Sequence, residues 1–274
     1  LGTVIVGAAA TSYGAPVEFN PCLECKLCVA ACPTGAILPD GSFNFIACYT
    51  HNYREFMGGF SDWVETVADS PSAKAYRTKV TDGETVSMWQ SLAYGPNYKA
   101  AYCLSVCPAG EELIGGWLDD PKAHLEAVVR PLTEKPETVY VVSGSDAEDF
   151  VPRRFPKKHV RRVHSGRLVD SVATFLAGLP LAFQREKSEG LDAVYHFTFT
   201  GAEKAKATVT IRNKQLSVAP GHAGKADLAI TADAKTWLRF LTRDQSMPWA
   251  LATRRIRLRG SPRLLMAFGR CFPS

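Results

Sequence analysis

Residues 22–33, CLECKLCVAACP, place four cysteines with two, two and three residues between them and end in proline. Seven of the eight cysteines lie between Cys22 and Cys107, and the remaining one is Cys271. This crowding separates a cysteine-bearing part of the chain from an ordinary part. Because the chain is long enough to bury a core without disulfide bonds, we interpret the cysteines as metal ligands in a reducing compartment.

The spacing distinguishes between two kinds of metal site. Structural zinc sites use two close cysteine pairs that are separated by about a dozen residues or more. Here a third thiol follows after two further residues, and the fourth precedes proline. This is the run C-x2-C-x2-C-x3-C-P of bacterial ferredoxins, in which three thiolates bind one [4Fe–4S] cluster and the fourth binds another. We therefore predict iron–sulfur clusters rather than zinc.

The remaining ligands are predicted from a repeat of this ending, because residues 103–108 again read Cys-x3-Cys-Pro. By this symmetry, the thiols of the first cluster are Cys22, Cys25, Cys28 and Cys107. Those of the second are Cys32, Cys48 and Cys103. The second set is one thiolate short, because position 100 is alanine. A three-iron cluster, a solvent ligand, His51 or the distant Cys271 would account for this. A hydrogen bond to a cluster sulfur or to a backbone carbonyl is the other role open to His51.

Residues 1–115 resemble the iron–sulfur half of the epoxyqueuosine reductase and reductive dehalogenase superfamily. The resemblance rests on LGTVIVGAAATSYGAPVEF, CLECKLCVAACPTGAI, CYTHNYREF and CLSVCPAGE, and Ala100 departs from the family pattern. It implies two [4Fe–4S] clusters that pass electrons to a corrinoid held by an upstream domain. Since the chain begins at Leu1, about where that domain would end, we expect an upstream segment or a partner to carry the corrinoid and the catalytic acid. No catalytic residue is assigned in this chain.

The middle of the chain predicts helices and a small βαβ unit. Apolar residues recur at helical spacing beside Trp63 and Trp89, which we expect to pack over the cysteine loops, with a binding groove as the alternative. A helix interrupted at residues 120–121 is followed by the strand ETVYVV, a short helix and the extended segment KKHVRRV. We interpret the basic stretch 153–167 as a solvated face or linker, with a docking patch for an acidic electron donor as the alternative.

The last part of the chain alternates between apolar and polar residues. This pattern predicts strands in VYHFTFT, KATVTIRN and QLSVAP, which form a meander, and further strands in DLAITA and IRLRG. Helices are predicted in LVDSVATFLAGLPLAF, in AKTWLRFLTR with Asp233 as N-cap, and in SPRLLMAFGRCF. An antiparallel sheet with helices on one side encloses apolar space between the layers.

This order resembles a sterol carrier protein type 2 (SCP2) domain over residues 165–274, above all in ADLAITADAKTWLRFLT and MPWALATRRIRLRGSPRLLMAF. The resemblance implies a tunnel for sterols, fatty acids or acyl thioesters. Six apolar residues are candidates for its lining, and a place in the ordinary core is the other role open to each of them: Phe175, Leu179, Phe197, Trp237, Phe240 and Trp249.

Together these patterns predict an α+β protein in which a ferredoxin-like double iron–sulfur module precedes an antiparallel-sheet-plus-helices lipid-carrier domain. The expected boundaries are 1–125, 126–164 for the βαβ unit and linker, and 165–274. The favoured function is single-electron transfer through two clusters to a redox partner or the missing corrinoid site, with a lipid-binding domain attached. The alternative is a lipid carrier whose clusters are structural or redox-sensing. A net charge of +5 that is confined to short stretches does not favour nucleic acid as a partner. The absence of a long apolar run argues against a transmembrane segment, and we expect the cytoplasm.

Overall fold

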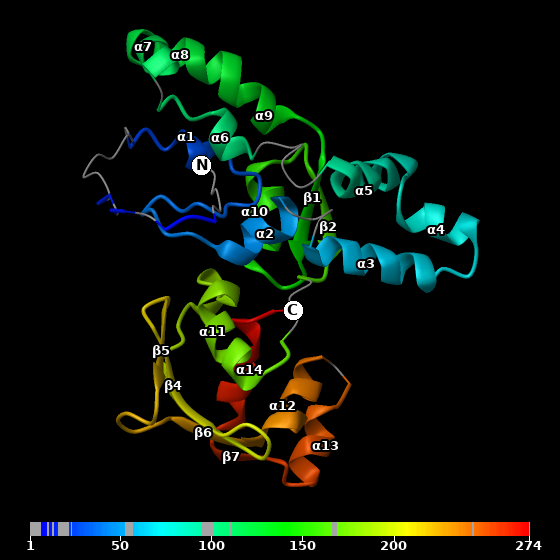
Figure 1. Cartoon of the computed structure of the whole chain (residues 1–274), viewed down its shortest axis with the longest axis vertical. Coiled ribbons are helices and arrows are strands. Elements are labelled where there is room, and N and C mark those ends of the chain that lie inside the picture. The colour runs from blue at the N-terminus through cyan, green and yellow to red at the C-terminus, as the bar shows by residue number, and fades with distance from the viewer. Residues whose placement is uncertain are drawn as a thin grey trace.

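The computed structural model describes residues 7–9, 11–12, 14–15, 22, 24–52, 57–94, 101–109, 111–165, 169–242 and 244–273. Its elements form two units that follow one another along the chain (Figure 1). The first unit contains α1 (Leu27–Ala31), α2 (Phe45–Asn52), α3 (Met57–Ala68), α4 (Ala73–Lys79), α5 (Asp82–Tyr94), α6 (Tyr102–Ser105), α7 (Glu111–Asp119), α8 (Pro121–His124), the π-helical turn η2 (Leu125–Val129), α9 (Arg130–Glu134), β1 (Thr138–Val142), α10 (Asp146–Arg154) and β2 (His159–Val163). The second unit contains α11 (Val172–Ala182), the 3₁₀ turn η3 (Glu186–Ser188), β3 (Ala193–Thr200), β4 (Ala205–Arg212), β5 (Gln215–Pro220), β6 (Leu228–Asp233), α12 (Ala234–Leu241), α13 (Met247–Ala252), β7 (Ile256–Gly260) and α14 (Pro262–Arg270).

A parallel pair of strands forms the centre of the first unit. β1 pairs with β2 from Thr138 opposite His159 to Val142 opposite Val163, and α10 makes the crossover. The Ser145 hydroxyl caps α10 by accepting the Glu148 N–H. Acidic residues occupy the first turn of α10 and arginines the last, an arrangement that complements the helix dipole. The predicted βαβ unit is confirmed.

The cysteine-bearing segment packs directly on this unit. Cys32 and Ala47 share one buried cluster with Val139 and Val141 of β1 and with Val151 of α10. α2 contacts β1 along its length, because small side chains on α2 allow a close approach. The βαβ unit and the cysteine loops therefore share a single core.

The predicted helix interruption lies at Asp120. Its carboxylate accepts the Ala123 N–H at 2.9 Å, and Pro121 occupies the first turn of α8. Because proline has no N–H to donate, it is tolerated where a helix begins and ends the helix that precedes it. The prediction is confirmed.

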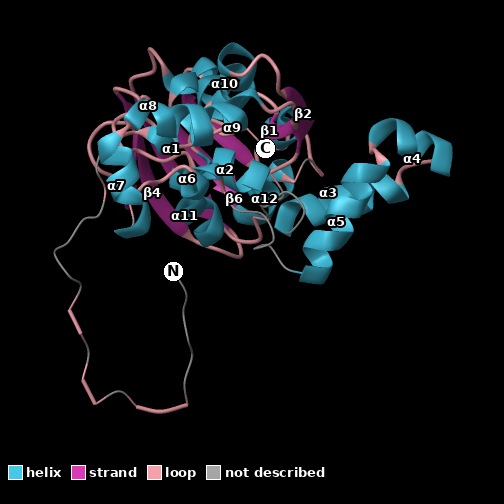
Figure 2. Ribbon diagram, turned by 90° about the horizontal axis from the view of Figure 1, so that it is seen from above, coloured by secondary structure: helices cyan, strands magenta, loops and turns pink. Residues whose placement is uncertain are grey.

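Helices α3, α4 and α5 extend away from the rest of the molecule (Figure 2). Within this arm, the Trp63 indole donates to the Tyr76 hydroxyl at 2.8 Å. Glu84 attaches the arm to the strand pair, because its carboxylate binds Arg161 and accepts the Tyr140 hydroxyl. Trp89 is 60% exposed, so the expectation that it packs over the cysteine loops is wrong. The reason is that α5 lies on the arm, where few neighbours can cover a large side chain.

The second unit is a five-stranded sheet with the order β5-β4-β3-β6-β7. β3, β4 and β5 form the predicted antiparallel meander, β6 pairs in parallel with β3, and β7 pairs antiparallel with β6. Residues of α11, α12 and α14 share one buried cluster with the inward-facing residues of the sheet. This unit confirms the predicted strands, the three predicted helices and the Asp233 cap, whose carboxylate accepts the Thr236 N–H at 3.0 Å. The prediction of an antiparallel sheet is wrong for one pair, because the chain crosses over after β5 and places β6 parallel to β3. Helix α13 was not predicted.

The α+β class is thus confirmed, whereas the ferredoxin-like character of the cysteine-bearing half stays a prediction. Among the described helices, none combines the length and apolar character needed to cross a bilayer.

Candidate functional site

The first cysteine run forms an irregular loop that leads into α1. Glu24 and Lys26, each between two cysteines, adopt left-handed backbone with φ of 53° and 58°. Such a conformation is uncommon for residues other than glycine, and it occurs where backbone N–H groups are turned towards an anion. The Glu24 N–H donates to Cys22 Sγ at 3.4 Å. The loop therefore already directs a backbone donor at a cysteine sulfur.

Cys32 lies buried at the end of α1 and accepts a second bond of this kind. The Ala36 N–H donates to Cys32 Sγ at 3.2 Å, and the Thr34 hydroxyl lies 3.6 Å from the same sulfur. The sequence does not show these contacts, because they depend on the path that the backbone takes after α1. Hydrogen bonds to sulfur are one means by which proteins tune a cluster.

Two thiols of the second predicted set lie together, because Cys48 packs against the buried cluster that contains Cys32. Burial, followed by the charges of Cys32 and Cys103, raises the pKa of the Cys48 thiol to about 11. Burial and then the charge of Cys32 also raise the pKa of Cys103, with a smaller effect from Cys28. Three thiols that are far apart in the sequence thus lie within electrostatic reach of one another.

The first predicted set is partly assembled. Burial raises the pKa of Cys28, the Val29 backbone opposes this effect, and the charges of Cys25 and Cys22 raise the pKa further. Cys107 is exposed beyond the end of α6. Its assignment to the first cluster stays a prediction.

Two alternatives for the missing ligand occupy defined places. The Tyr140 N–H donates to His51 Nδ1 at 3.3 Å, so this nitrogen is occupied and the ring is held against β1. Cys271 belongs to the core of the second unit, where its thiol donates to the Ala267 carbonyl at 3.3 Å. The structure therefore groups Cys271 with the second core and not with the cysteine loops.

α6, which carries Cys103, is held in place by a buried ion pair. The Tyr102 hydroxyl donates to Glu137 at 2.7 Å, and Lys158 donates to the other oxygen of the same carboxylate at 2.6 Å. The Lys158 ammonium also reaches the Leu132 and Lys135 carbonyls. Its side chain is 0% exposed. The interpretation of this basic stretch as a solvated face is therefore wrong for Lys158, because acceptors satisfy its charge inside the fold.

The same contacts set the acidity of Glu137 and Tyr102. Burial by itself would raise the pKa of Glu137, but hydrogen bonds from Lys158 and Tyr102 and the nearby lysine charges outweigh it and lower the pKa. Burial and the bond to Glu137 raise the pKa of Tyr102. The carboxylate therefore stays ionised and the phenol stays protonated, as the ion pair requires.

A single-ion site and a cluster make different demands on these thiols. Among the described residues, no three Cys, His, Asp or Glu side chains are arranged as the ligands of one metal ion. A cluster differs, because each thiolate binds a different iron atom. Because these thiols raise one another's pKa, they need a nearby positive charge to lose their protons and become thiolates. Bound iron would supply that charge. Lys26 is the nearest cation in sequence, and it is exposed.

A second candidate site lies in the interior of the second unit. Phe175, Phe197 and Trp237 are buried there with ring centroids 5.5–6.0 Å apart, and Leu179 lies in the same cluster. Phe240 is half-buried against Trp237 at 5.7 Å. Trp249 is 46% exposed and carries Arg255 over its ring. Four of the six candidate tunnel residues thus lie in the core, and Trp249 lies on the surface.

One buried donor in this interior has no partner in the described part of the chain. Trp237 is 2% exposed, and its indole N–H makes no hydrogen bond with any described residue. A buried polar group without a partner is costly, by about 1–3 kcal/mol. An oxygen atom of a bound molecule would satisfy it.

Comparison with known families decides the character of this unit. Residues 179–273 match the SCP-2 sterol transfer family. This SCP2-like domain ends one residue before the end of the sequence, and the match does not extend to the cysteine-bearing residues. A comparison with curated proteins found no match to the chain.

Solved structures with similar regions fall into two groups. The stereoselective inverting sec-alkylsulfatase Pisa1 from Pseudomonas sp. aligns with 78% of this chain at 17% identity and a TM-score of 0.35. The alignment covers 32% of the length of that enzyme, so this chain spans about a third of it. The palmitated SCP2L2 from Aedes aegypti aligns with 36% of this chain and 94% of its own at 20% identity, with a TM-score of 0.29. Sterol Carrier Protein 2 from Yarrowia lipolytica aligns with 39% of this chain and 97% of its own at 11% identity, with a TM-score of 0.32.

Proposed function

We propose that the SCP2-like domain binds a lipid whose head carries an oxygen acceptor, and that the cysteine-bearing half is an iron–sulfur electron-transfer module. The observation that carries the first part is the family match of residues 179–273. The unpartnered Trp237 N–H indicates where the oxygen acceptor of the lipid head would bind. An apolar interior with a single directed donor is the usual composition of a site for an amphiphilic ligand.

A matched pair of substitutions tests the lipid site in the full chain. Trp237→Phe keeps an aromatic ring and removes the N–H, whereas Trp249→Phe makes the same change at an exposed position. One hydrogen bond contributes about 1 kcal/mol, so the dissociation constant of cis-parinaric acid is expected to rise roughly 5-fold for Trp237→Phe only. Equal affinity in both variants would remove Trp237 from the site. An absence of binding in the unsubstituted chain would contradict the lipid function itself.

The cluster proposal rests on the convergence of Cys32, Cys48 and Cys103. These three residues would hold one cluster, and Cys22, Cys25, Cys28 and Cys107 the other. Bound clusters would supply reversible uptake of single electrons. The protein's own contribution is to hold the thiols together, direct backbone N–H groups at Cys22 and Cys32, and anchor α6 through Glu137.

Iron content provides the test. In anaerobically purified protein, Cys48→Ala is expected to lose the iron of the second cluster, whereas Cys271→Ala, also a cysteine substitution, keeps it. Electron paramagnetic resonance would separate a three-iron from a four-iron second site. Iron-free, colourless protein would overturn the proposal, and so would iron that is unaffected by Cys48→Ala.

The two possible functions, electron transfer and redox-sensing lipid carriage, predict different responses to reduction. Reversible bleaching with dithionite and transfer to an added acceptor support electron transfer to a redox partner. A change of lipid affinity on reduction, without such transfer, supports the redox-sensing carrier instead. The corrinoid that the family resemblance implies has no assigned residue in this chain and enters neither test.

A further inference from the structure

A cleft of about 950 Å³ lies between the two units, outside the interior of the SCP2-like domain. Its walls come from α1 and the loop that follows it, from α10, from the end of α11, and from the start of β5. A volume of this size is within the usual range for sites that take small organic ligands. Its lining shares Lys26 and Thr34 with the cysteine loop, but it contains neither a predicted cluster ligand nor Trp237.

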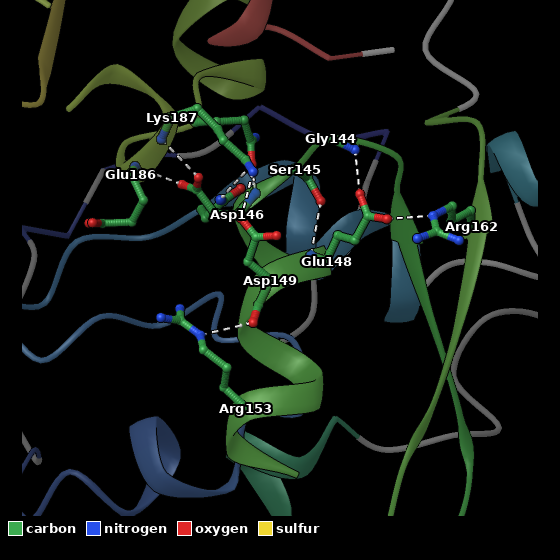
Figure 3. A network of polar contacts seen from close by, with 11 residues as sticks. Gly144, Ser145, Asp146, Glu148, Asp149, Arg153, Arg162, Glu186 and Lys187 are labelled. Carbon is green, nitrogen blue, oxygen red and sulfur yellow. Dashed lines mark hydrogen bonds and ion pairs between the residues drawn. The ribbon is translucent and has the colours of Figure 1, made fainter. Parts of the chain in front are cut away.

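The two units are linked directly beside this cleft. Gln184, which is fully buried, accepts the Asp146 N–H at 2.9 Å and the Asn44 side chain at 3.4 Å. Figure 3 shows Asp146 receiving the backbone N–H groups of Glu186 and Lys187. These bonds join the SCP2-like domain to the first unit, so the cleft has walls of defined position.

The carboxylates that line the cleft already have partners. Asp40 pairs with Arg185, Asp149 pairs with Lys187 at 2.6 Å, and Glu186 pairs with Lys214 at 2.8 Å. Asp146 is occupied by two backbone donors. None of these four carboxylates is left to neutralise a further cation.

Three lining cations have no carboxylate partner in the described part of the chain. Arg153 donates only to the Asp149 carbonyl of its own helix, at 3.0 Å (Figure 3). The Arg154 guanidinium lies over the Phe155 ring, and Lys26 is exposed at the start of α1. The positive charges of Lys26, Arg153 and Arg154 thus remain available in the lining of the cleft.

The rest of the lining is mainly apolar. Ile37, Leu38, Phe183 and Leu216 contribute to it, and Phe43 is 55% exposed there. An exposed phenylalanine in the lining of a cleft that also contains the three cations can contact the apolar part of a bound molecule. We propose that the cleft binds an apolar molecule with one anionic head group, a carboxylate or a phosphate. The three cations hold the head, and Phe43 and its neighbours contact the body.

Calorimetric titration of the full chain tests this assignment with three probes: dodecanoate, dodecyl phosphate and the uncharged dodecanol. The two anionic probes distinguish a carboxylate head from a phosphate head. The double variant Arg153→Gln and Arg154→Gln is expected to weaken the binding of the preferred anionic probe roughly 10-fold, because two partly exposed ion pairs to its head are lost. The affinity for dodecanol should not change. Phe43→Ser is expected to weaken all three probes.

The matched control is Arg257→Gln combined with Arg259→Gln, which removes the same charge from exposed positions of β7. Lys26→Gln, which lies at the start of α1, must also lower the affinity for the anionic probe, as the Arg153 and Arg154 double variant in α10 does. Equal affinities in the α10 variant and the β7 control would overturn the cleft proposal, as would no binding of either anion. Binding that is sensitive to Trp237→Phe but not to the cleft variants would leave the lipid function intact and remove the cleft.

Discussion

Lys158→Met breaks the buried ion pair that anchors α6, and its effect can be calculated from the geometry. The Lys158 side chain is 0% exposed and that of Glu137 is 19% exposed. The substitution leaves a mostly buried carboxylate with the Tyr102 hydroxyl at 2.7 Å and the more exposed Lys135 ammonium at 3.7 Å as its remaining partners. Breaking such a pair costs about 3–5 kcal/mol. Because Glu137 retains some solvent contact, we expect about 3 kcal/mol. At roughly 2–4 °C per kcal/mol for a chain of this size, the melting temperature should fall by about 6–12 °C.

Lys157→Met is the matched control, since Lys157 pairs with Glu134 at the surface, where both side chains are more than half exposed. Surface pairs contribute about 0–1 kcal/mol. Thermal and urea unfolding followed by circular dichroism measure both variants. Adding Glu137→Gln to Lys158→Met should recover more than half of the loss, because the buried charge is then removed as well. A melting temperature for Lys158→Met within about 2 °C of the control would refute the reasoning.

Three further predictions concern acid stability, glycine geometry and helix capping. The pKa values of Glu84 and Glu137 are lowered from 4.5 in the folded chain, so the stability they contribute is present above about pH 4.5 and is lost as the pH falls through their folded values. Urea midpoints that stay constant from about pH 7 to about pH 3 would contradict this. Gly260→Ala is expected to destabilise the SCP2-like domain by about 2 kcal/mol or more, because φ is 126° and the new Cβ would lie 2.3 Å from a backbone oxygen. Gly221→Ala, at a φ of 77° with open space around it, should cost about 1 kcal/mol, and equal thermal shifts would count against the argument. Asp233→Ala should cost about 1 kcal/mol through loss of the α12 cap, with Asp233→Asn nearly neutral in the same melting experiment.

The local features of the second unit could be predicted because they depend on short-range rules. Alternating residues in 193–233 predict strands, since successive side chains point to opposite faces of a sheet. Asp233 marks a helix start, because it offers an oxygen to an N–H three residues on. The helix predicted over 168–183 begins instead at Val172, where Ser171 caps it, and the pattern did not indicate this start. Trp237 was predicted as an apolar residue of the tunnel or core, but its unpartnered N–H was not, because that depends on what surrounds it.

The cysteine-bearing half shows the limit of such rules. Spacing grouped Cys32, Cys48 and Cys103 by symmetry, and the structure brings them within electrostatic reach of one another. The Ala36 N–H that donates to Cys32 belongs to the backbone and was not visible in the sequence. Lys158 was interpreted as a surface charge because lysine is normally solvated, and only the fold supplies the carboxylate and carbonyls that let it be buried.

The sequence alone therefore determined the strands and three of the helices of the SCP2-like domain and the presence of two compositionally distinct parts, whereas the grouping of the thiols stays a prediction. The tertiary structure decided how these parts meet. Gln184 contacts Asn44 across 140 positions of the chain, and the cleft beside them combines residues from both units. Such contacts depend on the packing of complete elements, so no periodicity or motif within either segment encodes them.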